Sequence, residues 1–271
     1  MWRVGIDVGG TFTDLFAWND DTREQVTAKV LTTKEDRSIG VLNALKEANI
    51  EPSNVSYLMH GTTTATNALI ERSFPKAGMV TTDGFRDTIE IGRQHRAHLY
   101  DPYQTKPKPI IKRRWRYTVG ERMDVNGEVV RPLPKEAAQE VAQKIKEQGL
   151  SSVAITFINA YASAAHEEQM RDIIKEVCPD VYVVLSAETQ PVFREHGRFA
   201  TTAIRAALIP VMEKYFNRLE QSLKDGGFNG RLLILKSSGG VTGVEYAKQH
   251  PEELIESGPA GGVAYAAYLS R

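Results

Sequence analysis

The sequence predicts an α/β protein in which a mixed β-sheet carries helices on its flanks. Residues 4–18 alternate apolar with small or polar positions around a glycine pair, which is typical of a β-hairpin. Residues 135–185 alternate strand and helix patterns, which favours parallel β-α-β units with right-handed crossovers. With 271 residues, 41% of them hydrophobic, the chain can bury one large core or two small ones.

Charge and composition narrow the classes of function. Lys plus Arg and Asp plus Glu both number 34, so no overall charge attracts nucleic acid or an anionic membrane, and we expect neither partner. The basic residues 106–116 could form a nucleic-acid patch, but their prolines and apolar interruptions favour an exposed loop that leads into a strand.

The single cysteine, Cys178, excludes an intrachain disulfide and a cysteine-cluster metal site, and we expect it to be a small buried residue. No apolar run approaches the roughly 20 residues that span a bilayer, and Asp7 interrupts the apolar stretch at the start of the chain. We therefore expect a cytoplasmic protein.

The first hairpin carries the most informative polar groups. Gly9 and Gly10 permit backbone angles that other residues avoid, and their N–H groups can close on an anion. Thr11 and Thr13 add hydroxyl donors, and Asp7 offers a carboxylate to a metal ion or to water. The turn is either a tight hairpin with glycines for geometry or a phosphate-binding loop.

After the hairpin we predict strand 26–31, helix 38–49 and strand 55–59. A second polar segment follows these elements. Residues 60–67 then pass from polar residues into a helix that one of residues 62–64 caps. Four threonines exceed what a cap requires, which favours a ligand at the positive helix end. His60 is as compatible with a structural hydrogen bond as with catalysis.

A basic cluster follows the predicted strand 76–81 and the turn at Asp83 and Gly84. Its members are Arg93, His95, Arg96 and His98, which crowd into six positions with few apolar neighbours. The cluster indicates a loop that contacts an anionic or polar molecule. A metal site is the weaker alternative because spacing fixes no third ligand.

The second half of the chain alternates helices and strands after a β-rich excursion. Residues 103–134 are expected at the edge of the main sheet, with strand 114–119 and a hairpin turn at Asn126-Gly127. His166 is expected to be structural. The further predicted elements are helix 135–148, strand 153–157, helix 164–177, strand 181–185, helix 201–225 bent or restarted at Pro210, strand 232–235, helix 244–248 and a last helix after a glycine-rich turn at 257–262.

Several segments together carry a resemblance to a known family. They are residues 5–14, 60–67, 90–94, 99–101, 237–240 and 257–262. In this order they resemble the A-type subunit of the hydantoinase and 5-oxoprolinase family, and the Asp-x-Gly-Gly-Thr segment at residues 7–11 resembles the first phosphate loop of the actin and sugar-kinase superfamily. The resemblance implies an actin-like, ribonuclease H-like mixed sheet that forms one lobe of a two-lobed ATPase. It also implies an N-terminal family domain over residues 1–185 and the beginning of the core region over residues 186–271, ending before a second phosphate loop.

The resemblance further implies ATP and Mg²⁺, or Mn²⁺, as cofactors, with Asp7 organising the metal. The implied catalytic residues are Asp7, Thr11, Asp14 and Thr63. The implied ATP-binding residues are Gly9, Gly10, Thr11, Thr13, Gly261 and Gly262. The implied substrate-binding residues are His60, Thr62, Thr64, Thr66, Asn67, Arg93, His95 and Arg96.

Three functions remain open from the sequence. The first is an ATP-dependent hydrolase that phosphorylates the lactam oxygen of a cyclic amide such as hydantoin or 5-oxoproline. The second is an ATP-dependent ketone carboxylase, and the third is a non-catalytic nucleotide-binding scaffold. The resemblance implies an oligomer with a B-type subunit and a second lobe as partners, so we expect the isolated chain to lack activity.

Overall fold

The computed structural model describes residues 1–33, 36–95, 98 and 100–270, and they form two compact units. The first unit contains residues 1–73 and 211–271, and the second contains residues 74–210. The first unit is discontinuous because β11 (Arg231–Leu235) pairs with β4 (Val55–Thr62). The structural units therefore do not coincide with a linear division after residue 185.

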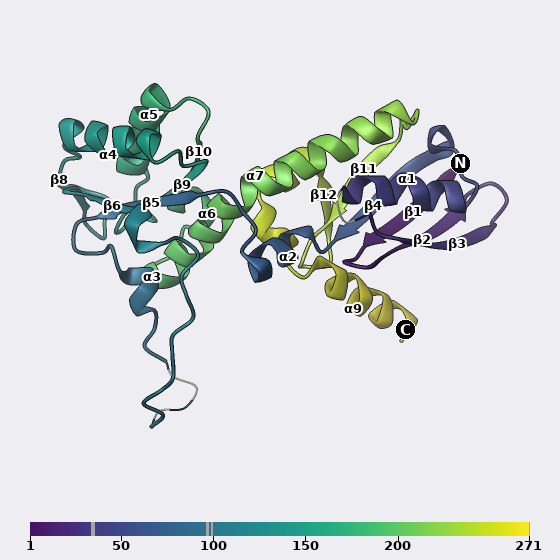
Figure 1. Ribbon diagram of the computed structural model, residues 1–271, viewed down its shortest axis with the longest axis horizontal. Helices are drawn as coiled ribbons and strands as arrows, with labels where there is room; N and C mark the ends of the chain where they lie inside the picture. The colour runs from purple at the N-terminus through teal and green to yellow at the C-terminus, as the bar shows by residue number, and fades with distance from the viewer. Residues whose placement is uncertain (34–35, 96–97, 99, 271) are drawn as a thin grey trace. The chain divides into compact units, whose positions relative to one another are not determined.

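The first unit contains a mixed sheet, as the sequence predicts (Figure 1). Its order is β12-β11-β4-β1-β2-β3, with β4 parallel to both β1 and β11 and the other pairs antiparallel. The remaining elements of this unit are β1 (Trp2–Val8), β2 (Phe12–Asn19), β3 (Gln25–Leu31), α1 (Arg37–Glu47), α2 (Thr64–Glu71), β12 (Val241–Gly243), α8 (Val244–Gln249) and α9 (Ser257–Leu269).

Helices cover both faces of the first sheet. Val4, Ile6 and Val8 are buried on one face, where Tyr215 of α7 (Glu195–Asp225) bonds to His60, the register partner of Ile6. Alternation places Asp7 on the other face, where α9 lies. Within this unit Figure 1 shows α7 in green and α9 in yellow on opposite sides of the sheet.

The second unit contains a parallel sheet with the order β10-β9-β5-β6. Its elements are β5 (Ala77–Thr82), α3 (Thr88–Ile91), β6 (Arg116–Val119), β7 (Arg122–Met123), β8 (Val129–Arg131), α4 (Lys135–Glu147), β9 (Ser152–Thr156), α5 (Ala165–Val177), β10 (Tyr182–Leu185) and α6 (Ser186–Thr189). The parallel strands confirm the β-α-β prediction. The β-rich excursion is not at the edge of the main sheet, because β6 borders this second sheet and β7 and β8 pair separately.

Two helices differ from their predicted limits. Helix α7 begins at Glu195 rather than residue 201 and continues through Pro210. The first turn of α7 can bury the charged Arg198 because the guanidinium donates hydrogen bonds to the carbonyls of Val192 and Phe157. Helix α9 begins at Ser257, so the expected glycine-rich turn is helical.

Two residues have the structural roles that the sequence predicts. Cys178 is buried and its thiol lies 3.6 Å from the carbonyl oxygen of Ala142. His166 is buried, and its Nδ1 lies 2.7 Å from a carboxylate oxygen of Glu121. A search of the described helices finds none that is both long and apolar enough to cross a membrane.

The close approach of β11 to β4 gives a stability prediction. A Cβ at Gly230 would lie 2.3 Å from the carbonyl oxygen of Val55, so we expect Gly230→Ala to lower the free energy of unfolding by about 1–3 kcal/mol. The matched control is Gly5→Ala, because the nearest atom to a Cβ at Gly5 is 3.9 Å away. Urea unfolding of both variants checks this, and equal stabilities would contradict the pairing of β11 with β4.

Candidate functional site

The parallel pairing of β1 with β4 assembles the candidate site. Asp7 is the register partner of Gly61, and Val8 is the partner of Thr62, so both strands end at the same edge of the sheet. The Thr63 N–H then donates to the Val8 carbonyl at 3.3 Å. The hairpin turn and the start of α2 therefore lie beside each other.

Asp7 occupies a space bordered by two glycines. A Cβ at Gly61 would lie 3.0 Å from the Asp7 Oδ1, and a Cβ at Gly258, in the first turn of α9, would lie 3.7 Å from both carboxylate oxygens. Asp7 is nevertheless an exposed residue. Partial desolvation, and then the negative charge of Asp14, raise the pKa of the Asp7 carboxyl above its usual value. The site thus favours a cation or a proton donor beside this group.

The turn after Asp7 has backbone N–H groups that are available to a ligand. Gly9 donates its N–H to the Phe12 carbonyl at 3.0 Å, whereas the N–H groups of Gly10 and Thr11 bond to no other residue that the structure describes. Neither glycine has a positive φ, so the turn does not use the left-handed region that glycine permits. Their absent side chains instead leave the turn uncovered, and Gly10 and Thr11 are both exposed.

Thr13 and Asp14 point to opposite faces of the sheet. The Thr13 side chain is fully buried and its hydroxyl lies 3.0 Å from that of Thr32, so it cannot reach a ligand at the turn. This correction follows from the two-residue period of a strand. Asp14 shares the face of Asp7, and its carboxylate accepts a hydrogen bond from the Lys29 ammonium at 2.7 Å.

The threonines at the start of α2 form local hydrogen bonds. The Thr62 hydroxyl accepts the Thr64 N–H at 3.2 Å, although Thr63 is the residue at the N-cap position. The Asn67 amide donates to the Thr63 hydroxyl at 3.2 Å, and the Thr66 hydroxyl accepts the Glu256 N–H at 3.0 Å. Thr62 is buried, whereas the other three threonines and Asn67 are partly accessible.

His60 is completely buried and does not reach a surface where a ligand could bind. Its Nε2 lies 2.8 Å from the Tyr215 hydroxyl oxygen. Burial lowers the pKa of His60 to about 4 and raises that of Tyr215. The structural alternative for His60 therefore fits its environment better than direct substrate contact.

The basic loop belongs to the second unit. Gly92 has a φ of 64° and lies near the His196 ring, while the Arg93 guanidinium lies near Gly197 of α7. Burial, and then the charge of Arg93, lower the pKa of His196. His95 is exposed, and Arg96 lies outside the described residues. Sequence reasoning did not assign His196 to this cluster, although it lies in a charged segment.

The two predicted nucleotide-binding glycines of α9 have different surroundings. A Cβ at Gly261 would lie 2.9 Å from a methyl group of Leu235, so this glycine allows α9 to pack on β11. Gly262 is exposed. The helix residue beside Asp7 is Gly258, which the sequence marks only as part of the glycine-rich segment.

The residues at this edge of the sheet provide some of the groups that would hold a metal ion. Among the described residues, no group of three or more His, Cys, Asp or Glu side chains could hold a metal ion. Mg²⁺ often retains several waters and binds through one or two carboxylates together with substrate phosphates. Asp7, with room left at Gly61 and Gly258, suits that mode of binding.

Comparison with known proteins shows that this α/β fold is similar to those of a caprolactamase and an acetone carboxylase. The chain is 43% identical over its whole length to an uncharacterized protein of Methanocaldococcus jannaschii and 30% identical over 96% of its length to the caprolactamase subunit alpha of Pseudomonas jessenii. The solved ATP-dependent caprolactamase of that organism is 29% identical, with a TM-score of 0.85 over 95% of this chain. The nucleotide-free structure of acetone carboxylase is 25% identical, with a TM-score of 0.87 over 99% of this chain.

Two family models match the chain and identify the family to which it belongs. Residues 3–178 match the hydantoinase/oxoprolinase N-terminal region, and residues 198–271 match the hydantoinase/oxoprolinase model. The chain belongs to the hydantoinase/oxoprolinase family. It spans 40% of the length of the M. jannaschii relative and 39% of the caprolactamase subunit.

The buried histidine gives a pH prediction. We expect the His60 ring to stay neutral down to about pH 4, because burial disfavours its charged form. An unfolded histidine has a pKa of about 6.5, so the native state binds fewer protons and its stability falls as the pH falls from about 6.5 towards 4. NMR titration of the ring signals, assigned with His60→Gln, measures this directly. A His60 ring that titrates near pH 6.5 would contradict the buried environment.

Proposed function

We propose that the first unit binds the phosphates of Mg²⁺-ATP at the turn formed by residues 9–11 and that the complete enzyme uses ATP to open a cyclic amide. The observation that carries this proposal is the position of Asp7 between an open glycine turn and the first turn of α9. Backbone N–H groups and a helix N-terminus attract phosphate oxygens, and the adjacent carboxylate can hold hydrated Mg²⁺.

Each group would contribute by position and charge. The free N–H groups of Gly10 and Thr11 would donate to phosphate oxygens, and the exposed Thr11 hydroxyl would add a donor. A bound Mg²⁺ would neutralise phosphate charge. Thr63 and Asn67, which share a hydrogen bond beside the turn, would orient the group that accepts the phosphoryl. Such positioning and charge stabilisation account for most catalysis of phosphoryl transfer.

Phosphorylation suits the chemistry of a lactam. Amide resonance makes the ring carbonyl a poor electrophile, and transfer of phosphate to its oxygen makes the carbon open to attack by water.

Arg93 and His95 are proposed to contact the substrate or a partner. The relatives are more than twice as long as this chain, and we propose that a second lobe and a B-type subunit complete the nucleotide and substrate sites.

Ketone carboxylation is the second candidate, supported by the likeness to acetone carboxylase. The same phosphate site could activate bicarbonate or an enolised ketone. An ATPase assay of the assembled enzyme separates the candidates, because cyclic amides should stimulate the hydrolase and ketone plus bicarbonate should stimulate the carboxylase. Nucleotide binding without stimulation by either would favour a scaffold.

The proposed role of Asp7 gives an activity prediction. We expect Asp7→Asn to reduce ATP hydrolysis by the assembled enzyme at least a hundredfold, by the magnitude typical of lost charge stabilisation. Its melting temperature should stay the same or rise, because a carboxylate with a raised pKa is a cost to the native state at neutral pH. Asp180→Asn, at an exposed position of the second unit, is the control. Wild-type turnover in Asp7→Asn would remove Asp7 from the chemistry.

A further inference from the structure

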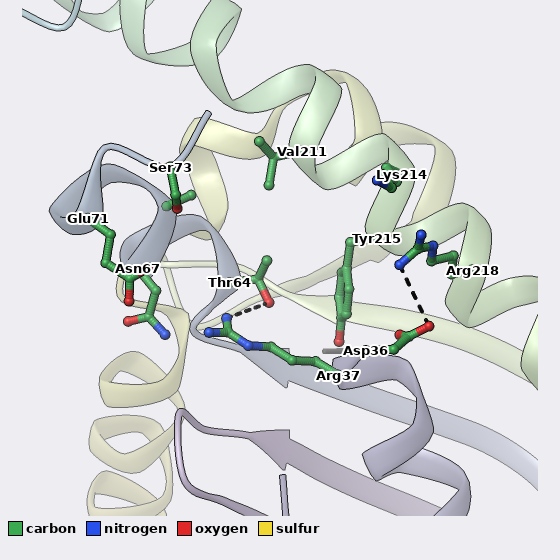
Figure 2. Close-up of a pocket in the computed structure, with 11 residues that line it drawn as sticks. Asp36, Arg37, Thr64, Asn67, Glu71, Ser73, Val211, Lys214, Tyr215 and Arg218 are labelled. Atoms are coloured by element: carbon green, nitrogen blue, oxygen red, sulfur yellow. Dashed lines mark hydrogen bonds and ion pairs between the residues drawn. The ribbon is translucent and has the colours of Figure 1, made fainter. Parts of the chain in front are cut away.

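A polar pocket lies in the first unit between α1, α2 and α7, on the side of the sheet that α7 covers (Figure 2). Its volume is about 240 Å³, and Arg37, Asn67 and Tyr215 are among the residues that line it. Thr64 lines it as well, and Figure 2 shows the hydrogen bond that joins this threonine to Arg37. Tyr215 connects the pocket with the completely buried His60.

A continuous chain of hydrogen bonds leads from His60 to the start of α2. The Tyr215 hydroxyl oxygen lies 2.8 Å from the Nε2 of His60, and the same hydroxyl forms a hydrogen bond with the Thr62 side chain. The hydroxyl oxygens of Thr62 and Thr64 are 2.8 Å apart. The Arg37 guanidinium donates to the Thr64 hydroxyl at 3.3 Å and ends the chain. The direction of each hydroxyl hydrogen therefore depends on that of its neighbour.

The His60 ring sets the direction of this chain. Burial lowers the pKa of His60 to about 4, so at neutral pH the ring has one N–H donor and one acceptor nitrogen. Its Nδ1 is buried and has no hydrogen-bond partner among the residues that the structure describes. A buried N–H without a partner is rarer in proteins than a buried acceptor without one, and it is costly. The proton therefore belongs on Nε2, where Tyr215 can accept it.

The remaining directions follow from the number of donors and acceptors. His60 donates to the Tyr215 oxygen, so the buried Tyr215 hydrogen has Thr62 as its acceptor. Thr62 also accepts the Thr64 N–H at 3.2 Å, which fills both of its acceptor positions, and its hydroxyl must donate to Thr64. The Thr64 oxygen then accepts from Thr62 and from Arg37. Its own hydrogen must point away from the chain.

We propose that His60 and Tyr215 are positioning residues that orient the Thr64 hydroxyl as a hydrogen-bond donor to an oxygen atom of a molecule bound at the start of α2. The same chain holds the Thr64 N–H on Thr62 and so fixes the first turn of the helix that carries Asn67. His60 and Tyr215 do not touch the bound molecule themselves. The direction of the chain does not rest on the proposed function, whereas its effect on turnover does.

The protonated nitrogen of His60 can be measured on the purified chain without nucleotide. Proton–nitrogen correlation NMR of the ring at pH 7, with the signals assigned by their loss in His60→Gln, distinguishes a protonated Nε2 from a protonated Nδ1. We expect the proton on Nε2. A proton on Nδ1 would reverse every hydrogen bond of the chain and overturn the proposal.

Kinetics of the assembled enzyme test the positioning role. Tyr215→Phe removes one hydroxyl, and we expect it to lower kcat for substrate-stimulated ATP hydrolysis about three- to tenfold, the factor that one lost hydrogen bond typically represents. The KM for ATP should stay nearly unchanged, because the phosphates are proposed to bind at residues 9–11. Tyr246→Phe is the matched control, since the Tyr246 hydroxyl donates to Glu253 at 2.7 Å outside the chain and its loss should leave kcat unchanged.

Conservative variants at the two ends of the chain separate positioning from folding. His60→Gln keeps a side-chain N–H that can donate to Tyr215, so it should retain more of the kcat than His60→Leu. Thr64→Ser keeps the hydroxyl donor, whereas Thr64→Val has nearly the same shape and lacks it. Thermal unfolding monitors the fold of each variant.

Three kinetic outcomes would overturn the proposal. They are an unchanged kcat in Tyr215→Phe, an equal loss of kcat in Tyr215→Phe and Tyr246→Phe, or equal turnover by Thr64→Ser and Thr64→Val. An assembled enzyme that hydrolyses no ATP would contradict the proposed function instead, and the ring measurement would still decide the direction of the chain.

Discussion

The candidate site depends on the contact between the Asp7 carboxylate and the glycine backbone of β4. Parallel pairing places Gly61 directly beside Asp7, and a Cβ at that position would lie 3.0 Å from the carboxylate oxygen. The same register aligns the end of β1 with Thr62. A side chain at position 61 would meet the Asp7 carboxylate, which would have to shift away from β4.

Two sets of polar groups use opposite faces of one sheet. Asp7 faces α9, while the pocket that Arg37 and Tyr215 line lies on the side of α7. Asn67 borders both.

The sequence predicted regular elements well and side-chain environments less well. Alternation identified the β1–β2 hairpin, and the Asn126-Gly127 turn identified the β7–β8 hairpin. The sequence did not predict the early start of α7, where the buried Arg198 guanidinium donates to the carbonyls of Val192 and of Phe157, 41 residues away. Likewise, no local pattern could reveal that His60 meets Tyr215, 155 residues away. The pocket between α1, α2 and α7 was missed for the same reason, since all three helices supply part of it.

The central claim is that the turn after β1 receives the phosphates of ATP, and amide NMR on the isotope-labelled chain tests it most directly. Titration with Mg²⁺-ATP should shift the amide signals of Gly10, Thr11 and Gly258, because the first two residues have free N–H groups in the turn and Gly258 lies beside Asp7. Signals of the parallel sheet in the second unit should stay unchanged. Saturable shifts that leave Gly10 and Thr11 unaffected and appear elsewhere would contradict the account.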